Sequence, residues 1–421
     1  MFFLRFVCLV VFLSMCGEAH HAARAQAASK ETPFVFRDPR RHQARVPVTL
    51  QRNLLVVSVL LNGSGPFNFL LDTGVSTTII TSAKLADSLH LPHGERFRVV
   101  GAGGTSTGLQ AYQTDSLRMT INGVEAPFLS PLVLADDVLN LSGFVGVPVH
   151  GILGSELFRS FVVSLHSEEA YMLLSDPATF RAPTGRNWSA LPLSLEKGKA
   201  YITAPVQLTD SLTLPLKLVL DTGASHALSI ETDSDPRIAV PVHRLPAELG
   251  QGLSGVVRGY MGRVPILRLG RYELRSVLTS YPDGADVHRR IDVPRNGNVG
   301  YELLKRFSLV IDYPHQRLLL RPNLRLREPF EHDMCGLDLL AFGPEYRRYR
   351  VLRVVPDSPA HKAGAEPEEE LISINLLPAE AFSLTQLSRM LRSEDGRLLL
   401  LLLRRPNGDL HTVTLRLKRQ I

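Results

Sequence analysis

The 421-residue sequence contains little cysteine: its three thiols belong to Cys8, Cys16 and Cys335. The first two lie in an apolar N-terminal segment that we expect to be removed, so Cys335 remains alone and an internal disulfide is excluded. A chain of this length can instead be stabilised by a hydrophobic core. The sequence has neither a His-Glu-x-x-His motif nor clustered cysteines and histidines, so we expect no metal site and no cofactor.

A long apolar run is also missing. The N-terminal run is too short for a bilayer span, and no later stretch reaches the roughly 20 uncharged residues that a span needs. Because Arg5 precedes this run and Ala23-Arg24-Ala25 fits the small-residue cleavage rule, residues 1–25 are predicted to be a signal peptide. We therefore expect export to the periplasm, the cell surface or the extracellular space. Membrane attachment through a lipidated Cys16 is a further alternative.

Charge of one sign does not dominate the chain. Its 47 lysines and arginines exceed its 41 acidic residues by a net +6, but they are scattered in short pairs such as Arg40-Arg41 and Arg289-Arg290. They line no single face, so they favour a solvated surface over a nucleic-acid partner. Hydrophobic residues make up 44% and charged residues 21%, which is typical of globular proteins, and the length fits two or three domains.

The most informative feature that is present is the tripeptide Asp-Thr-Gly, which occurs twice. Asp72-Thr73-Gly74 follows the largely apolar residues 67–71, and Asp221-Thr222-Gly223 follows residues 216–220. A single copy would be read as a plain turn after a strand. Two copies that lie inside a longer repeat are not explained by that reading.

The repeat extends well beyond the tripeptide. Three further pairs of segments recur in the same order: residues 46–50 with 191–195, the glycine-rich 101–104 with 250–255, and 152–161 with 298–307. Internal repetition of this kind predicts two similar β-rich lobes. We place them at residues 46–180 and 188–327, after a linker or pairing strand over residues 26–45.

Two aspartates brought together in this way can catalyse hydrolysis. Like charge raises the pKa of one carboxyl group, so that the pair holds a single proton, a behaviour already established for other paired-aspartate sites. The ionised carboxylate can then take a proton from water while the protonated carboxyl donates to a carbonyl oxygen. The sequence therefore predicts that Asp72 and Asp221 are the catalytic residues, with water as the nucleophile.

The neighbouring residue types suit this chemistry. The glycines let the backbone pass close to the carboxylates, the threonines can hydrogen-bond across the lobe interface, and the serines are placed to bond the outer carboxylate oxygens. A glycine-rich hairpin can close over the substrate and exclude water. The predicted supporting residues are Thr73, Gly74, Ser76, Thr222, Gly223 and Ser225, and the predicted flap residues are Gly101, Gly103 and Gly104.

These motifs resemble the aspartic peptidases of the pepsin and retropepsin superfamily over about residues 46–325. The family pattern ends each lobe with two apolar residues and a glycine; Ile152-Leu153-Gly154 matches it, and Asn298-Val299-Gly300 departs from it through the polar Asn298. No Tyr-Gly pair marks the flap tip, which is more similar to a retropepsin. The resemblance implies a mainly β, bilobal acid-protease barrel fold, a polypeptide substrate and a monomer that contains both aspartates.

Residues 330–421 resemble a small α+β bacterial PDZ domain. The Ser358-Pro359-Ala360 segment carries the resemblance, together with Gly336, Leu337, Asp338 and Leu339, which are similar to the family's carboxylate-binding loop and binding strand. The resemblance implies that these four residues hold the C-terminus of a peptide by adding it to the sheet. Glu369-Glu370 departs from the family pattern, so a packing role beside the catalytic domain is an alternative.

Two functional hypotheses follow from the sequence. The first is an aspartic endopeptidase whose PDZ domain recognises a substrate or partner. The second is a catalytically weak, bilobal peptide-binding protein or envelope sensor that works through its PDZ domain. The intact Asp-Thr-Gly motif in both halves favours the endopeptidase.

Overall fold

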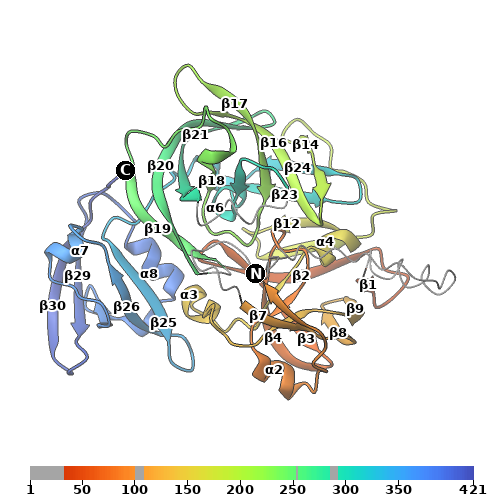
Figure 1. Ribbon diagram of the computed structural model, residues 1–421, viewed down its shortest axis with the longest axis horizontal. Helices are drawn as coiled ribbons and strands as arrows, with labels where there is room; N and C mark the ends of the chain where they lie inside the picture. Colours follow the sequence, from red (N-terminus) through yellow and green to blue (C-terminus); the bar gives the residue numbers. More distant parts are fainter. Residues whose placement is uncertain (1–32, 100–108, 253–254, 285–292) are drawn as a thin grey trace, which may run out of the picture.

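The computed structural model describes residues 33–99, 109–252, 255–284 and 293–421. The predicted signal peptide and the flap residues Gly101, Gly103 and Gly104 lie outside these ranges. Figure 1 shows two β-rich lobes, coloured from orange to teal, with a separate blue body at their side. The mainly β architecture that the sequence predicts is confirmed. Among the described residues, no helix is long and apolar enough to cross a membrane.

The first lobe is built from short strands joined by tight turns. The β3–β4 and β8–β9 hairpins turn at Asn62-Gly63 and Asn122-Gly123, where the glycines have φ of 83° and 86°. Such left-handed positions favour glycine in hairpin turns. The elements are β1 (Val35–Phe36), β2 (Gln43–Gln51), β3 (Leu54–Leu61), β4 (Ser64–Leu71), β5 (Ile79–Ile80), α2 (Ala83–Ser88), β6 (Arg96–Val99), β7 (Leu109–Gln113), β8 (Leu117–Ile121), β9 (Val124–Leu129), β10 (Leu132–Leu134), α3 (Leu141–Val145), β11 (Gly151–Leu153), α4 (Glu156–Ser160), β12 (Val162–His166) and β13 (Tyr171–Ser175).

The second lobe repeats this plan. In each lobe the strand before Asp-Thr-Gly runs parallel to a short strand from the closing unit: Leu71 of β4 lies opposite Leu153, and Leu220 of β17 lies opposite Val299. The elements are β14 (Ser189–Pro192), β15 (Ser194–Glu196), β16 (Lys199–Gln207), β17 (Thr213–Leu220), β18 (Leu228–Ile230), η1 (Thr232–Ser234), β19 (Leu245–Gly252), β20 (Gly255–Leu269), β21 (Tyr272–Pro282), β22 (Gly297–Val299), α6 (Tyr301–Leu304), β23 (Phe307–Asp312), β24 (Arg317–Pro322) and η3 (Leu324–Arg327).

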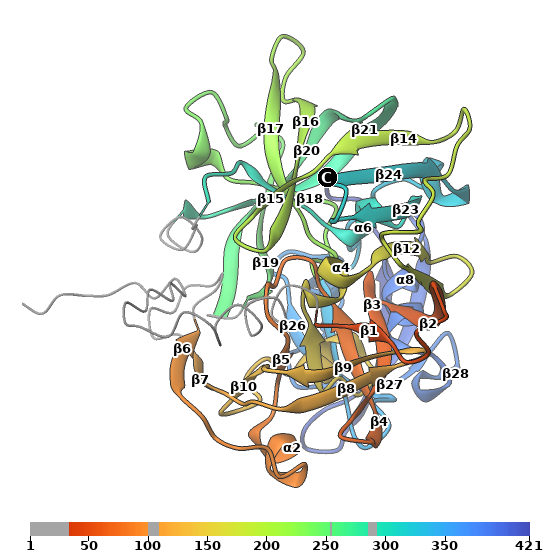
Figure 2. The same ribbon diagram turned by 90° about the vertical axis from the view of Figure 1, so that its right-hand side faces the viewer.

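The two lobes share one continuous sheet. The strand order β14-β24-β23-β12-β13-β2 crosses the interface where β12 and β23 pair antiparallel, with Ser164 opposite Val310. In Figure 2, β23 and β12 lie next to each other where the two lobes meet. Leu165 and Leu309 are each 1% exposed in a core that extends through both lobes, and burying such a side chain contributes roughly 1.5–3 kcal/mol. The sheet and core together fix how the two lobes face each other.

The segment predicted as a linker or pairing strand belongs partly to the first lobe. Val35 in β1 pairs with Glu125 in β9, and β2 already begins at Gln43. Phe34 is 2% exposed and packs in the core. Within its described residues, this segment therefore acts as a pairing strand.

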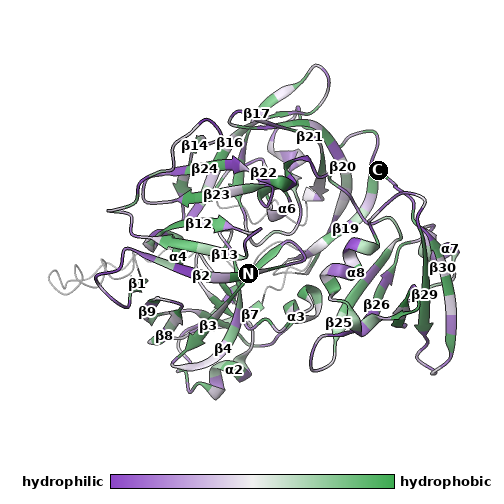
Figure 3. Cartoon of the chain, turned by 180° about the vertical axis from the view of Figure 1, so that it is seen from behind, coloured by the Kyte–Doolittle hydropathy of each residue, from purple (hydrophilic) through white to green (hydrophobic). Residues whose placement is uncertain are grey.

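The C-terminal body has its own sheet and its own core. Its hydrophobic cluster runs from Met334 to Leu417, and in Figure 3 hydrophobic stretches lie along many strands while the loops are mostly hydrophilic. The elements are β25 (Leu337–Phe342), β26 (Arg348–Val354), α7 (Pro359–Lys362), β27 (Glu370–Ile374), β28 (Leu377–Pro378), η4 (Ala379–Ala381), α8 (Leu384–Met390), β29 (Leu398–Arg404) and β30 (Leu410–Arg416). A capping box between Ser383 and Gln386 begins α8, which stabilises its first turn.

Helix α8 is docked on the tip of the β2–β3 hairpin. The backbone N–H of Arg52 donates to Thr385 Oγ1 at 3.0 Å, and this hydroxyl donates to Gln51 Oε1 at 2.8 Å. Beside it, Leu384 packs so closely on Gly146 that a Cβ there would lie 2.6 Å from the leucine Cβ. The C-terminal body thus contacts the first lobe through specific polar and apolar contacts.

Candidate active site

The two Asp-Thr-Gly loops meet at the interface between the lobes. Each begins where a parallel strand pair ends: Asp72 N–H donates to Leu153 O at 2.9 Å, and Asp221 N–H donates to Val299 O at 3.0 Å. The backbone of each aspartate is therefore fixed by the closing unit of its own lobe. Both aspartate residues are intermediate in exposure, neither fully buried nor fully exposed.

Thr73 and Thr222 lock the two loops together. Each backbone N–H donates to the hydroxyl of the other threonine, at 3.0 Å in both directions. Each hydroxyl then donates across the interface, Thr73 Oγ1 to Leu220 O at 2.6 Å and Thr222 Oγ1 to Leu71 O at 2.8 Å. Both threonines are fully buried, so these four bonds are shielded from water. They are the cross-interface bonds that the sequence predicts.

The two glycines allow the carboxyl groups to come together. A Cβ on Gly223 would lie 2.1 Å from Asp72 Cγ, and a Cβ on Gly74 would lie 2.9 Å from Asp221 Oδ1. Each carboxyl group therefore lies against the glycine of the opposite loop. Gly74 N–H also donates to Asp72 Oδ1 at 2.6 Å, and Gly223 N–H donates to Asp221 Oδ1 at 3.1 Å.

This proximity changes the protonation of the pair. Burial raises the pKa of Asp72 to about 8, with further contributions from the charge of Asp221 and from a hydrogen bond between the two carboxyl groups. The N–H of Gly74 and the charge of Lys199 act in the opposite direction. Near neutral pH, the pair of carboxyl groups therefore holds one proton.

Asn298 is a member of the site that sequence reasoning treated only as a departure from the family pattern. Its Nδ2 donates to Asp221 Oδ2 at 2.8 Å, and its Oδ1 lies 3.3 Å from Nε2 of His226. Burial lowers the pKa of His226 despite the nearby charge of Asp221, so the imidazole is neutral and can donate from Nε2. The signal in the sequence was a polar residue at the position that Ile152 occupies in the first lobe.

The structure corrects the expectation for Ser76 and Ser225. In the described part of the chain, neither hydroxyl bonds a carboxylate oxygen of the aspartates. Each serine instead contacts a hairpin tip from the opposite lobe: a Cβ on Gly198 would lie 3.0 Å from Ser76 Cβ, and Asn53 Nδ2 donates to Ser225 O at 3.1 Å. The outer oxygen of Asp221 is bonded by Asn298, which fills the role expected of the serine.

In the C-terminal body, the loop predicted to bind a peptide carboxylate already holds a carboxylate of its own chain. The backbone N–H groups of Cys335 and Gly336 donate to Asp333 Oδ2, the first at 3.2 Å. Gly336 has φ of 81°, and a Cβ there would lie 2.2 Å from Ser358 Cβ, so glycine is required. The Cys335 thiol is buried, which raises its pKa well above the usual value and makes it a poor nucleophile.

The other three residues of this loop and strand lie at the boundary with the protease lobes. Leu337 and Leu339 are buried, and Asp338 forms an ion pair with Arg353. All three line a cavity shared with residues of both lobes. Peptide capture by this loop stays a prediction.

Comparisons with known proteins match two separate segments of the chain. Residues 57–157 match the aspartyl protease family, and residues 350–405 match the PDZ domain family. The search of curated proteins found no match. Among solved structures, a photosystem II D1 C-terminal processing protease is similar, with 24% identity over 20% of this chain and 22% of its own, and a TM-score of 0.19 that supports no argument.

The aspartyl protease match contains Asp72 and ends within the first lobe. The second lobe is related to it by the repeated strand pairing, by the second Asp-Thr-Gly loop and by the bonds between Thr73 and Thr222. The PDZ match falls within the third sheet and its core. The chain therefore combines an aspartyl protease-like segment, at residues 57–157, with a PDZ-like segment near its C-terminus, at residues 350–405.

Proposed function

We propose that the chain is an aspartic endopeptidase that hydrolyses peptide bonds with a water molecule activated by Asp72 and Asp221. The observation that carries this proposal is the close approach of the two carboxyl groups, one of which has a pKa raised to about 8. Perturbed carboxyl pairs in a cleft are typical of acid–base catalysis. The buried Thr73–Thr222 bonds supply the rigidity that such a pair needs.

The surroundings of the aspartates assign their roles. Asp221 accepts a hydrogen bond from Asn298, which favours the ionised carboxylate, whereas Asp72 keeps the proton. Asp221 takes a proton from the water molecule while the water oxygen attacks the carbonyl carbon of the substrate. Asp72 gives its proton to the carbonyl oxygen. The tetrahedral intermediate then breaks its C–N bond, the leaving nitrogen takes the proton from Asp221, and Asp72 recovers its own.

The test is hydrolysis of a randomised peptide library by the purified chain. We expect Asp72→Asn and Asp221→Asn each to lower kcat by on the order of 10²–10⁴-fold, because each removes one proton-transfer group. The double variant should be little worse than either single one, since the two groups act on one water. Asp210→Asn, at an exposed turn, is the matched control and should keep full activity. Wild-type activity in either dyad variant would show that the assignment is wrong.

The alternative, a catalytically weak binding protein or envelope sensor, has less support. Its sensor loop would be the PDZ loop, whose Cys335 and Gly336 N–H groups are already bonded to Asp333. It would predict peptide binding without cleavage in the same library experiment. We further propose a polypeptide substrate and an exported, monomeric protein, which sequencing of the mature N-terminus and sedimentation of the secreted chain would check.

A further inference from the structure

The second lobe departs from the first at two positions that touch each other. Counted from each Asp-Thr-Gly motif, the first lobe has Thr77 and Ile152 where the second has His226 and Asn298. These two residues are 72 positions apart in the sequence, yet His226 Nε2 lies 3.3 Å from Asn298 Oδ1. The two departures therefore form one structural unit, which the first lobe lacks at its equivalent positions.

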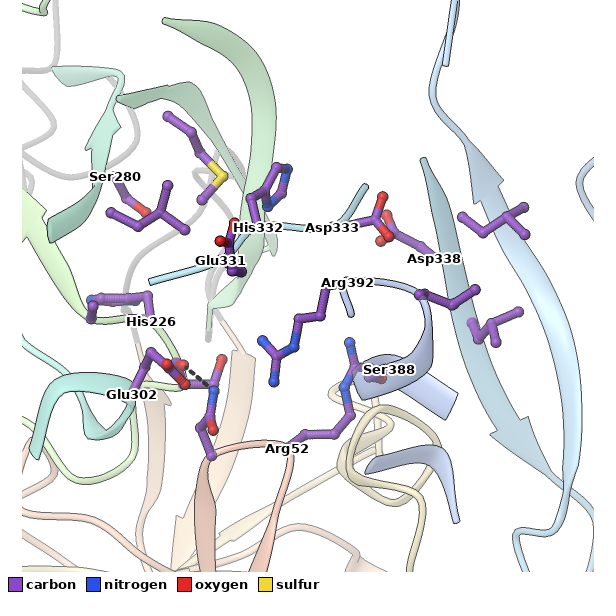
Figure 4. Close-up of a pocket in the computed structure, with 18 residues that line it drawn as sticks. Arg52, His226, Ser280, Glu302, Glu331, His332, Asp333, Asp338, Ser388 and Arg392 are labelled. Carbon is purple, nitrogen blue, oxygen red and sulfur yellow. Dashed lines mark hydrogen bonds between the residues drawn. The ribbon is translucent and has the colours of Figure 1, made fainter. Parts of the chain in front are cut away.

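The backbone of His226 is held by the same closing unit that carries Asn298. Its carbonyl oxygen accepts a hydrogen bond from the N–H of Glu302 at 3.3 Å. A Cβ on Gly300 would lie only 2.1 Å from this oxygen, so glycine permits the close approach of the two segments. Figure 4 shows His226 at the border of a cavity of about 220 Å³ between the protease lobes and the PDZ domain. The imidazole is thus fixed within reach of Asn298.

The hydrogen bonds of Asn298 determine which ring nitrogen of His226 carries a hydrogen. Asn298 Nδ2 donates to Asp221 Oδ2 at 2.8 Å, so Oδ1 faces Nε2 and accepts from it. Burial lowers the pKa of His226 and keeps the ring neutral, although the charge of Asp221 acts in the opposite direction. Within the residues that the structure describes, neither ring nitrogen bonds a carboxyl group of the dyad. The influence of His226 on the dyad therefore passes through Asn298.

These two bonds select one of the two orientations of the Asn298 amide. Half a turn of the amide would bring two acceptors together at Asp221 and two donors together at His226, so both ends oppose it. A hydrogen bond to Oδ1 also polarises the amide and makes its N–H groups stronger donors. Loss of the imidazole would weaken both the orientation of the amide and its bond to the carboxylate.

We propose that His226 is a positioning residue for the general base Asp221 and acts through Asn298. The imidazole holds the amide in the orientation that stabilises the ionised carboxylate, and it exchanges no proton with the substrate or with water. The assignment of Asp221 as a base rests on the proposed function, whereas the hold of His226 on Asn298 does not.

Peptide hydrolysis by His226→Thr, which gives the second lobe the residue of the first, tests this role. We expect kcat to fall about fivefold, the worth of one neutral hydrogen bond, and KM to stay unchanged because the contact acts on the chemical step. His226→Gln should recover kcat to within about twofold, because a glutamine amide can donate to Asn298 Oδ1. His243→Thr, at an exposed position of the same lobe, is the matched control and should keep full activity.

A double-mutant cycle tests whether His226 acts through Asn298. Asn298→Leu removes the amide, so the addition of His226→Thr to this variant should cause no further loss of kcat. Losses that multiply would show that His226 acts on the dyad by another route, or only on folding, and would overturn the proposal. The same conclusion would follow if His226→Gln were as slow as His226→Thr.

Solvent exchange of the Asn298 side-chain amide protons measures the same contact without hydrolysis. NMR of the full-length chain identifies these signals by their loss in Asn298→Leu. In His226→Thr they should exchange about fivefold faster, since one of the two bonds that hold the amide is gone. The backbone N–H of Asp221, which donates to Val299 O at 3.0 Å, should keep its exchange rate and so exclude a general loosening. An unchanged rate for the Asn298 protons would overturn the proposal.

The two measurements separate this proposal from the proposed function. If the intact chain hydrolyses no peptide but exchange is faster in His226→Thr, the endopeptidase function fails and the hold of His226 on Asn298 stands. If the intact chain hydrolyses peptides and His226→Thr leaves kcat unchanged, the positioning role fails and the endopeptidase function stands.

Discussion

The two lobes present the same loop to the dyad with different neighbours behind it. Behind Asp72 the first lobe places Ile152, an apolar residue that is 7% exposed and packs in a small hydrophobic cluster. At the equivalent place the second lobe has Asn298, which bonds Asp221 and contacts His226. The backbone that is repeated in both lobes thus positions the two aspartates in the same way. The side chain of Asn298 gives Asp221 a hydrogen-bond donor for which Ile152 offers Asp72 no counterpart.

The different neighbours of Asp72 and Asp221 matter because the two loops are similar but the proposed reaction gives the two carboxyl groups different roles. Hydrolysis needs one carboxyl that takes a proton and one that gives a proton. In a perfectly symmetric pair either aspartate could play either part. In the proposed reaction, the Asn298 side chain beside Asp221 favours Asp221 as the base, and the buried bonds of Thr73 and Thr222 hold the two loops in place.

The largest effect in this comparison is expected at the two glycines. In Gly223→Ala the new Cβ would overlap Asp72 Cγ and displace this carboxyl group. Because such a displacement of a catalytic group can lower the rate about 100-fold, kcat/KM should fall by more than about 100-fold. Gly74→Ala should be milder, since its Cβ approaches Asp221 only to 2.9 Å. Peptide hydrolysis by both variants measures the difference. If Gly74→Ala were as inactive as Gly223→Ala, the two glycines would have equally little space beside the opposite carboxyl group, which would contradict this prediction.

An intermediate effect is expected at Asn298. Asn298→Leu makes the second lobe resemble the first and removes a charge-assisted bond worth about 1.5–3 kcal/mol, so kcat/KM should fall by about tenfold or more. Because the ionised form of the dyad loses a donor, the acid limb of the pH–rate profile should move to higher pH. Ile152→Leu is the control and should leave the profile in place. An unshifted acid limb in Asn298→Leu would contradict the assigned roles.

The smallest effect is expected on stability. The pKa of Asp72 is raised from 3.8 to about 8 in the folded chain, so ionisation favours the unfolded state as the pH rises between these values. Below the lower value both states are protonated and the aspartate makes no difference. Asp72→Asn should therefore raise Tm by a few degrees near pH 8 and leave it unchanged near pH 3, as calorimetry would measure. A Tm difference that is independent of pH would contradict the raised pKa.

Local patterns in the sequence predicted much of the fold. The internal repeat predicted two β-rich lobes, and the segment Ser358-Pro359-Ala360 predicted a small α+β body after them; the structure has both. The repeat also placed both aspartates at equivalent strand ends.

Contacts between distant residues could not be predicted in the same way. The bond from Asn298 to Asp221 joins residues 77 apart in sequence, and the bond from Arg52 to Thr385 joins residues 333 apart. No local pattern encodes such a pair, and the structure does not show the bond to the aspartates that Ser76 and Ser225 were assigned. The carboxylate of Asp333 in the PDZ loop was missed because an acidic residue before a strand usually means a solvated turn.

The β2–β3 hairpin tip has a consequence for sequence change during evolution. Surface turns normally accept insertions and deletions because little depends on their length. This tip is covered on both sides: Gln51 and Arg52 bond the PDZ helix, and Asn53 bonds the loop after Asp221. A single added or deleted residue would break one contact or the other, so the length of this turn should be held constant among descendants of this chain even where its residues drift.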